Sequence, residues 1–349
     1  MNASGASGAS RDQSIHSPGS PGPDTNPSAP GPPTVLITGG AGFLGSHLCD
    51  RFLGEGWRVL ALDNLLTGSI EQIAHLSAHE SFRFIHYNVT HYLHFDEPID
   101  LILHFACPAS PLDYAQFPIQ TMKVDSLGTL NSLGLARAKQ SRYVFASTSE
   151  VYGDPREHPQ KESYWGHVNP VGPRSMYTES KRFSEAMCMA YHRHHGLDVR
   201  IARIFNTYGP RMRLDDGRVI PTFIARALRG QPLLLHGNGD QTRSFCQVDD
   251  MVDGLLRLST REGIAGVVVN LGNPEEVSIR ELARKILEMS GGKGGMANCA
   301  MPADDPVRRR PDIALARQIL DFEPRIDLDT GLSGMIPWVR EKLKNELKS

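Results

Sequence analysis

The sequence predicts an α/β fold: a parallel, doubly wound Rossmann sheet with a smaller, discontinuous C-terminal lobe. Two observations predict this class. Short apolar segments alternate with longer segments of helical spacing from Thr34 onward. A glycine-rich turn over residues 38–45 joins the first apolar segment to the first helical one. The alternation then continues, and it is typical of a parallel sheet that helices cover on both faces.

The expected strands are short apolar runs, which are typical of strands buried on both faces. They span residues 35–37, 57–62, 82–87, 101–106, 143–146, 199–204 and 267–271. Helical spacing is found between them, most clearly at residues 44–53, 121–139 and 177–194. Since parallel crossovers are right-handed, these elements predict a doubly wound sheet.

The glycine-rich turn has the Gly-x-x-Gly-x-x-Gly spacing of a dinucleotide-binding turn, with Gly39, Gly42 and Gly45 between a strand and a helix. The first glycine permits a tight turn, the second lets the backbone approach a pyrophosphate, and the third lets helix and strand pack closely. The helix N-terminus offers N–H groups and a positive dipole end to the phosphates. A glycine-rich turn without a ligand is the alternative, but the strand–turn–helix context of the motif is present.

Asp63 ends the second expected strand, where a carboxylate accepts hydrogen bonds from the hydroxyls of an adenosine ribose. The same carboxylate repels a 2′-phosphate, so the sequence favours NAD over NADP. The expected cofactor contacts are Gly39, Gly42, Phe43, Leu44, Gly45, Asp63 and Asn64, together with Tyr177 and Lys181.

Tyr177 and Lys181 are four residues apart in an expected helix and therefore share one helix face. A phenol has a pKa of about 10 in water, but a nearby ammonium and a positive nicotinamide both favour the phenolate. We therefore expect a lowered pKa for Tyr177, which lets it take a proton from a sugar hydroxyl as hydride leaves carbon. The spacing alone also fits an exposed tyrosine and lysine, but behind a dinucleotide turn it indicates hydride-transfer chemistry.

Composition restricts the other classes of function. With 40% hydrophobic and 22% charged residues and a formal charge of −2, the chain has no basic field that would favour nucleic acid. No apolar run approaches the roughly 20 residues that span a bilayer, so no membrane partner is expected. The five cysteines form no Cys-x-x-Cys pair, which indicates reduced thiols in a cytoplasmic protein and no metal site.

Several segments resemble a known family. The glycine turn, Thr148 at a strand end and the pair Tyr177 and Lys181 resemble the extended short-chain dehydrogenases/reductases, the NAD-dependent epimerase/dehydratase family. Within it, the chain is similar to the UDP-glucuronate decarboxylases (UDP-xylose synthases) from about Thr34 to Arg340. The segments that carry this similarity are residues 147–155, 164–170, 202–212, 215–219, 241–245 and 304–313.

The resemblance implies NAD-dependent decarboxylation of UDP-glucuronate to UDP-xylose through a UDP-4-keto sugar, with NAD recycled in the site. Tyr177 and Lys181 then act in proton transfer, and Thr148 hydrogen-bonds the C4 oxygen. Ser149 and Glu150 assist decarboxylation or protonation at C5. Ser149 stands where the 4,6-dehydratases of the family carry Asp, which disfavours dehydration. A salt-bridged or helix-capping carboxylate is the alternative for Glu150.

The resemblance also implies the substrate contacts. Arg309 is expected to bind the substrate carboxylate, because a guanidinium binds a carboxylate as a planar fork, whereas Arg308 and Arg310 are interpreted as a solvated basic loop. Relatives dimerise through two helices, including the one with the catalytic tyrosine, so a homodimer is expected. The remaining expected contacts are Arg218 and Arg243 to the diphosphate, Asn206 to a phosphate or the sugar, and Lys123 and Asn131 near the substrate.

The chain departs from the family pattern at several positions. Thr178 and Ser180, between the tyrosine and the lysine, replace the usual Asp and Gly, and Cys107 replaces a Ser. Asn88 replaces an Asp near the adenine, and Val124 replaces a Thr near the cofactor. None of these changes removes a reacting group.

The expected domain organisation follows the motifs. Residues 1–33, more than half of them Gly, Ser and Pro, cannot bury enough surface to fold and are expected to be a disordered tail. Residues 34–206 are expected to form the NAD-binding Rossmann domain, to which residues 240–275 return. Residues 207–239 and 276–345 are expected to form the substrate-binding lobe.

Two other functions stay open. A UDP-sugar 4-epimerase that acts on UDP-glucuronate or UDP-glucose begins with the same oxidation but needs room for the keto sugar to flip. A catalytically silent NAD-binding regulator is less favoured, because such proteins commonly lose the tyrosine or the lysine, and both are present here.

Overall fold

The computed structural model describes residues 31–215, 217–301 and 308–346. Residues from Pro32 onward form one compact unit, to which every element named below belongs. Most of the expected disordered tail, residues 1–30, lies outside the described residues, so the tail stays a prediction. Residues 304–307 of the family-like segment 304–313 lie outside them as well.

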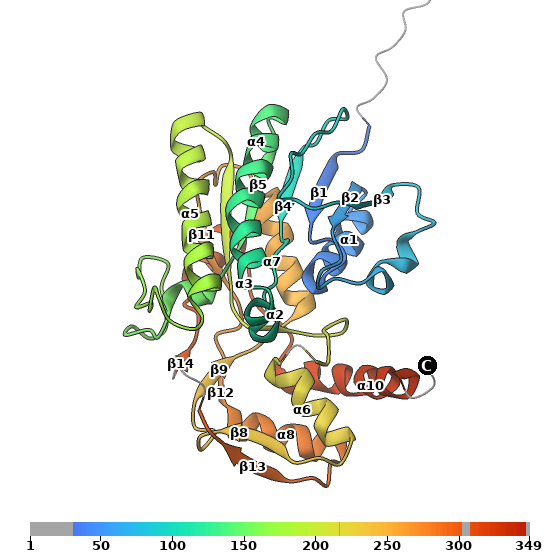
Figure 1. Ribbon diagram of the computed structural model, residues 1–349, viewed down its shortest axis with the longest axis vertical. Coiled ribbons are helices and arrows are strands. Elements are labelled where there is room, and N and C mark those ends of the chain that lie inside the picture. Colours follow the sequence, from blue (N-terminus) through green and yellow to red (C-terminus); the bar gives the residue numbers. More distant parts are fainter. Residues whose placement is uncertain (1–30, 216, 302–307, 347–349) are drawn as a thin grey trace, which may run out of the picture. The chain divides into compact units, whose positions relative to one another are not determined.

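A seven-stranded parallel sheet forms the central layer, as predicted (Figure 1). Its strand order is β11-β6-β5-β4-β1-β2-β3, so the chain reverses its direction of growth between β1 and β4. In doubly wound sheets, ligands bind outside the carboxyl ends of the strands at this reversal. The strands are β1 (Thr34–Thr38), β2 (Arg58–Asp63), β3 (Phe82–His86), β4 (Leu101–His104), β5 (Arg142–Thr148), β6 (Val199–Ile204) and β11 (Val268–Leu271).

The strands are buried on both faces because their side chains alternate between two apolar clusters. In β1, Val35 and Ile37 belong to one cluster and Leu36 to the other. The first cluster is closed by α1 (Phe43–Gly54), α7 (Val248–Thr260) and α9 (Ala314–Leu320). The second is closed by two helices that lie side by side in Figure 1, α4 (Thr129–Lys139) and α5 (Ser175–His195).

The helix expected over residues 121–139 is three consecutive elements: α3 (Pro118–Lys123), the π-helical segment η3 (Val124–Gly128) and α4. A π turn holds more residues than an α turn and is frequent at functional sites. Apolar spacing cannot reveal such a local expansion, and the sequence therefore predicted one continuous helix. Segment η3 carries Asp125, which is fully buried.

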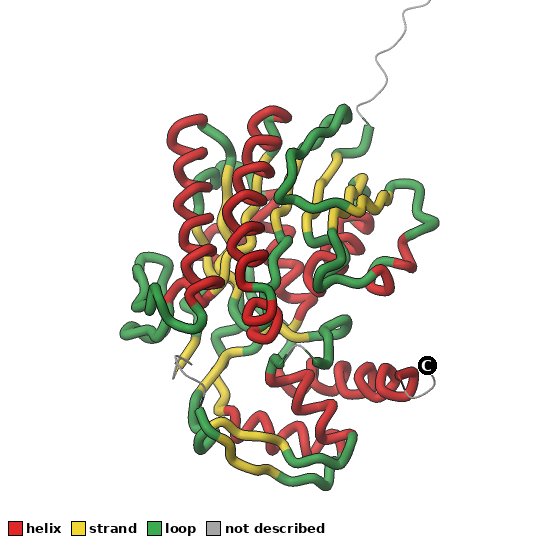
Figure 2. Tube along the Cα trace, viewed as in Figure 1, coloured by secondary structure: helices red, strands yellow, loops and turns green. Residues whose placement is uncertain are grey.

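A third apolar cluster underlies the smaller elements that follow residue 207. Strands β8 (Leu233–His236) and β13 (Met296–Cys299) pair with each other and lie beside α6 and α8 (Figure 2). Strand β9 (Thr242–Ser244) pairs with β12 (Glu276–Ser278) and with β14 (Arg308–Arg309), which places Arg243 beside Arg309. The helices of this group are α6 (Val219–Leu228), α8 (Ile279–Ser290) and α10 (Leu328–Glu346).

Local sequence sets the start of helix α8. The Ser278 hydroxyl accepts a hydrogen bond from the Glu281 N–H, which caps this helix.

Among the described residues, no helix is both long and apolar enough to cross a membrane. The remaining short elements are α2 (Pro111–Gln116), η1 (Ile70–Gln72), η2 (Ala74–Leu76), η4 (Ser149–Tyr152), β7 (Thr207–Tyr208) and β10 (Cys246–Gln247).

The turn between β1 and α1 depends on two of its glycines. Gly39 has φ of +75°, a conformation that side chains with a Cβ rarely adopt. A Cβ added to Gly45 would lie 2.0 Å from the carbonyl oxygen of Gly39. Backbone atoms therefore fill the space that a side chain at residue 45 would need.

We predict that Gly45→Ala lowers the free energy of unfolding by roughly 1–3 kcal/mol, because the backbone of the turn must shift. Gly54→Ala is the matched control: it lies in the same helix, and its added Cβ meets no atom within 4 Å. The control should be neutral or stabilising by up to about 1 kcal/mol. Urea unfolding of both variants checks this, and equal midpoints would contradict the steric role of Gly45.

Candidate active site

A cavity of about 900 Å³ lies at the carboxyl edge of the seven-stranded sheet. This volume is at the upper end of the range for small-molecule and cofactor sites. The cavity brings together nearly all the residues that the sequence singled out: Gly39, Gly42, Phe43, Leu44, Gly45, Asp63, Asn64, Lys123, Thr148, Ser149, Glu150, Tyr177, Lys181, Asn206, Arg218, Arg243 and Arg309.

One wall of the cavity fits a dinucleotide. Gly42 stands at the N-cap of α1 and has no side chain, so the first N–H groups of the helix lie open to the cavity. The close contact between Gly39 and Gly45 keeps the turn compact and its backbone accessible. Such a helix N-terminus attracts phosphate through its N–H groups and its dipole. The cradle therefore suits the pyrophosphate of NAD.

Asp63 ends β2 at the same wall. Its Oδ2 accepts a hydrogen bond from the Ala41 N–H (3.0 Å) and its Oδ1 accepts one from the Leu65 N–H (2.8 Å). Burial raises the pKa of Asp63, and these hydrogen bonds oppose the rise. The carboxylate is held in place and keeps acceptor capacity for ribose hydroxyls. The next residue, Asn64, is exposed and accepts a hydrogen bond from the Leu66 N–H.

Tyr177 lies in the first turn of α5 and is buried. Its hydroxyl lies near Thr148, which favours the phenolate form, and its ring stacks on Tyr114, with centroids 5.0 Å apart and planes at 12°. Burial raises the pKa of Tyr177 more than the Lys181 ammonium lowers it. The expected lowering of this pKa is therefore wrong for the protein alone, because the sequence showed the neighbouring cation but not the depth of burial.

Lys181 points back into the protein from the next turn of α5. Its Nζ donates a hydrogen bond to the Ala146 carbonyl (3.0 Å) and lies 3.0 Å from Oδ1 of Asp125. Burial by itself lowers the pKa of Lys181, but the Asp125 carboxylate outweighs this effect, and the net pKa is raised. Lys181 therefore stays charged beside Tyr177 at neutral pH.

Thr148, Ser149 and Glu150 follow one another at the end of β5. Oγ1 of Thr148 accepts a hydrogen bond from the Glu150 N–H (3.2 Å), and Ser149 is buried in the cavity wall. The Glu150 carboxylate lies 2.7 Å from Nη2 of Arg174 and 3.6 Å from Nη1 of Arg309. Burial raises the pKa of Glu150, but the two guanidinium groups lower it by more, so the net pKa lies below the usual value of a glutamate. Glu150 is therefore an ionised, salt-bridged carboxylate and cannot donate a proton in this state.

Arg309 lies opposite, on β14. It is buried beside Arg243, and its Nε has no hydrogen-bond partner among the described residues. A buried N–H group without a partner is costly, so this guanidinium suits an anionic ligand. Arg308, one position earlier, is exposed, as expected for a solvated arginine. Arg310 is only partly exposed and its Nε is buried, so its interpretation as a solvated arginine is wrong.

Asn131 is the expected substrate contact that does not line the cavity. Its Nδ2 donates hydrogen bonds to the carbonyls of Val89 (3.1 Å) and His91 (2.8 Å). Both of these residues line the cavity, so Asn131 supports a cavity loop from behind. Lys123, at the end of α3, lies at the cavity rim instead.

The sequence analysis did not single out three residues of the site: Asp125, Tyr114 and Arg174. A signal for Asp125 was present, because a carboxylate on the buried face of a helix needs a partner. Tyr114 and Arg174 lie in segments without a motif, and only the packing of α2 against α5 brings Tyr114 onto the Tyr177 ring. Their roles depend on contacts between distant segments.

The model of the NAD dependent epimerase/dehydratase family matches residues 35–272. UDP-glucuronic acid decarboxylase 3 of Arabidopsis thaliana is 50% identical over 299 residues, which cover 85% of this chain and 86% of the relative. UDP-glucuronic acid decarboxylase 1 of Xenopus tropicalis is 47% identical over 312 residues, or 89% of this chain and 73% of the relative.

Among solved structures, the UDP-glucuronic acid 4-epimerase of Bacillus cereus, in complex with UDP-glucuronic acid and NAD, aligns with a TM-score of 0.80 and 27% identity. The alignment covers 88% of this chain and 99% of that chain. The fold, the residues of the cavity and the sequence comparisons thus indicate the same family. The chain belongs to the NAD dependent epimerase/dehydratase family and, within it, groups with the UDP-glucuronic acid decarboxylases.

Proposed function

We propose that this protein decarboxylates UDP-glucuronate to UDP-xylose through a UDP-4-keto sugar. One observation carries the proposal: a single cavity holds the neighbouring hydroxyls of Tyr177 and Thr148 together with Arg309, a buried cation with an unpaired N–H group among the described residues. The hydroxyl pair suits a sugar C4–OH, and the guanidinium suits a carboxylate. The high identity to the two decarboxylases supports this assignment.

The chemistry at C4 uses the hydroxyl pair. NAD⁺ held by the glycine turn and Asp63 would supply the hydride acceptor for C4 and the donor that later reduces the ketone, so it would not be consumed. Tyr177 accepts the C4 hydroxyl proton, and Lys181, fixed in its charged form, stabilises the phenolate. The resulting β-keto acid loses CO₂ as the electron pair of the breaking C5–carboxyl bond moves into the C4 ketone. Thr148 hydrogen-bonds that oxygen and stabilises the developing enolate. C5 then takes a proton that comes from solvent, and Tyr177 returns its proton to the C4 oxygen when the ketone is reduced.

The chemistry at C5 uses the opposite wall. Arg309 holds the carboxylate until CO₂ leaves, and Glu150 orients Arg309 from behind. Since Glu150 is ionised, we assign it this orienting role and propose the buried Ser149 hydroxyl as a hydrogen-bond donor near C5. Lys123, Asn206, Arg218 and Arg243 line the rest of the cavity and provide contacts for the diphosphate and the sugar.

We also propose the domain division given by the motifs. Residues 34–206 and 240–275 bind NAD, and residues 207–239 and 276–345 bind the UDP-sugar. The third apolar cluster, which is built mainly from the latter segments, supports this division.

Five free cysteines support a cytoplasmic location.

We also propose that the protein forms a homodimer whose interface is built from α3, α4 and α5. The outward face of α5 carries Phe183, which is 52% exposed, and large apolar side chains are exposed on the neighbouring α3 and α4. Contiguous exposed apolar residues mark association surfaces. The residues of this surface are Ile119, Met122, Leu130 and Phe183.

Incubation with UDP-glucuronate and NAD⁺ tests the reaction. We expect equimolar CO₂ and UDP-xylose, with no net NADH. Tyr177→Phe should lower kcat by roughly 10²–10⁴-fold, since it removes the acid–base group. Tyr92→Phe, at a position 79% exposed, is the control and should keep full activity. UDP-galacturonate without CO₂ would identify the 4-epimerase, and a biological effect unchanged by Tyr177→Phe would identify the regulator.

Arg309→Gln should weaken binding of UDP-glucuronate by roughly 10–100-fold, the effect of losing a charge-assisted hydrogen-bond pair. UDP-glucose has no carboxylate, so its affinity should change little. Arg308→Gln, one residue away and exposed, is the matched control for both ligands. Titration calorimetry with each UDP-sugar checks this. An equal loss for the two ligands would show that Arg309 does not recognise the carboxylate.

Phe183→Glu should convert the dimer to monomers, because a charge would be buried in the proposed interface. Val171→Glu introduces the same charge at a position that is 89% exposed and outside the three helices. Sedimentation velocity compares the two variants with the parent protein. A monomeric parent, or a dimer that survives Phe183→Glu, would rule out this surface.

A further inference from the structure

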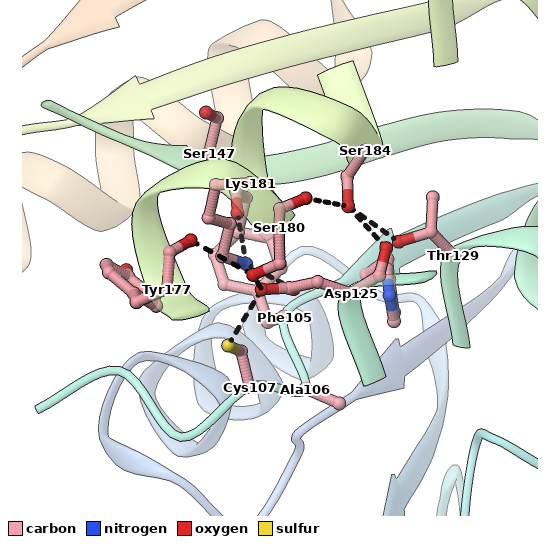
Figure 3. Close-up of polar contacts among 12 residues, drawn as sticks. Phe105, Ala106, Cys107, Asp125, Thr129, Ser147, Tyr177, Ser180, Lys181 and Ser184 are labelled. Carbon is pink, nitrogen blue, oxygen red and sulfur yellow. Dashed lines mark hydrogen bonds and ion pairs between the residues drawn. The ribbon is translucent and has the colours of Figure 1, made fainter. Parts of the chain in front are cut away.

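Asp125 is the centre of a buried polar network that the reaction described above does not use (Figure 3). Its Oδ1 lies 3.0 Å from Nζ of Lys181. Its Oδ2 accepts hydrogen bonds from the hydroxyl of Ser180 (2.9 Å) and the thiol of Cys107 (3.3 Å). The carboxylate is fully buried, so water does not screen its charge.

The backbone holds this carboxylate in a special position. Asp125 lies in the π-helical segment η3, and its carbonyl accepts a hydrogen bond from the Ser184 hydroxyl on α5. π-Helical turns of this kind are frequent at functional sites. The π segment and α5 thus fix Asp125 against Lys181 from two sides, unlike a surface ion pair, whose partners move freely.

We propose that Asp125 is a positioning residue for the acid–base tyrosine: as the buried counter-ion of Lys181, it holds the ammonium in place and partly offsets the positive field that Lys181 exerts on Tyr177. The proton affinity of Tyr177 then depends on Asp125 as well as on Lys181, Glu150 and the nicotinamide. The effect on the pH dependence of catalysis rests on the proposed function, whereas the effect on the stability of the ion pair does not.

The other titratable groups around the pair are neutral near pH 7. Burial, with Lys181 assisting, lowers the pKa of His104 to about 3. Burial raises the pKa of the Cys107 thiol and of the Tyr143 hydroxyl. Across the cavity, the ionised Glu150 also faces Tyr177 and is held by its own arginines. The charged groups near the tyrosine among these are therefore Glu150 and Lys181, and Lys181 is paired with Asp125.

Two of the donors to Asp125 are positions at which the chain departs from the family pattern. Ser180 stands where a Gly is usual, and Cys107 stands where a Ser is usual. A glycine at residue 180 would leave Oδ2 with one donor fewer. The hydroxyl of Ser180 is therefore one of two donors to Oδ2, while Oδ1 makes the ionic contact with Lys181 and has no hydrogen-bond donor among the described residues.

The pH profile of kcat/KM for UDP-glucuronate tests the kinetic part. Asp125→Asn removes a negative charge, which lowers the proton affinity of its neighbours, so the acidic limb should move to lower pH by about one to two units. Ser180→Ala, which removes a hydrogen bond to the same carboxylate but leaves its charge, should not move the limb. An unchanged limb or a shift to higher pH in Asp125→Asn overturns the proposal.

Thermal unfolding without substrate tests the ion pair independently of the reaction. Asp125→Asn leaves a buried ammonium without its counter-ion, which is strongly destabilising. Adding Lys181→Met removes that charge, so the double variant should melt at a higher temperature than Asp125→Asn alone, even if the single variant folds poorly. A double variant that melts no higher overturns the proposal. Inactivity of the parent towards UDP-glucuronate would instead contradict only the proposed function.

Discussion

The buried ammonium of Lys181 is the constraint on which the active site depends. A charge in the protein interior must be paired and hydrogen-bonded, and the partners of Lys181 come from β5 and from η3, through Ala146 and Asp125. Satisfying this one group therefore fixes α5 against the end of the sheet. Tyr177, one turn earlier on α5, is thereby held beside Thr148 at the carboxyl end of β5.

The parallel sheet brings the two halves of the chemistry to one place. All carboxyl ends of parallel strands meet at one edge, so the turn after β1 and the end of β5 open into the same cavity although they lie over a hundred residues apart in the chain. The small sheet β12-β9-β14 adds the opposite wall. Its parallel register sets Arg243 next to Arg309, and the two cations create a positive point that suits an anionic sugar nucleotide.

The sequence predicted what depends on local pattern. Apolar runs located the strands, glycine spacing located the turn, and the four-residue spacing of Tyr177 and Lys181 placed both on one helix face. It missed what depends on three-dimensional burial. The π segment that orients Asp125 leaves no trace in apolar spacing. The direction of the Tyr177 pKa depends on desolvation by distant segments, and Asn131, assigned by resemblance, is occupied by loop carbonyls.

Arg309 connects the two carboxylates that matter for turnover. Its Nη1 lies 3.6 Å from Glu150, longer than a hydrogen bond, while its Nε is buried without a partner among the described residues. In the proposed function, a substrate carboxylate binds the Arg309 guanidinium while Arg174, 2.7 Å from Glu150, keeps the Glu150 carboxylate paired. On this proposal the sugar would lose its ionic contact with Arg309 when CO₂ leaves. The product would then bind less tightly than the substrate, which would favour release after each turnover.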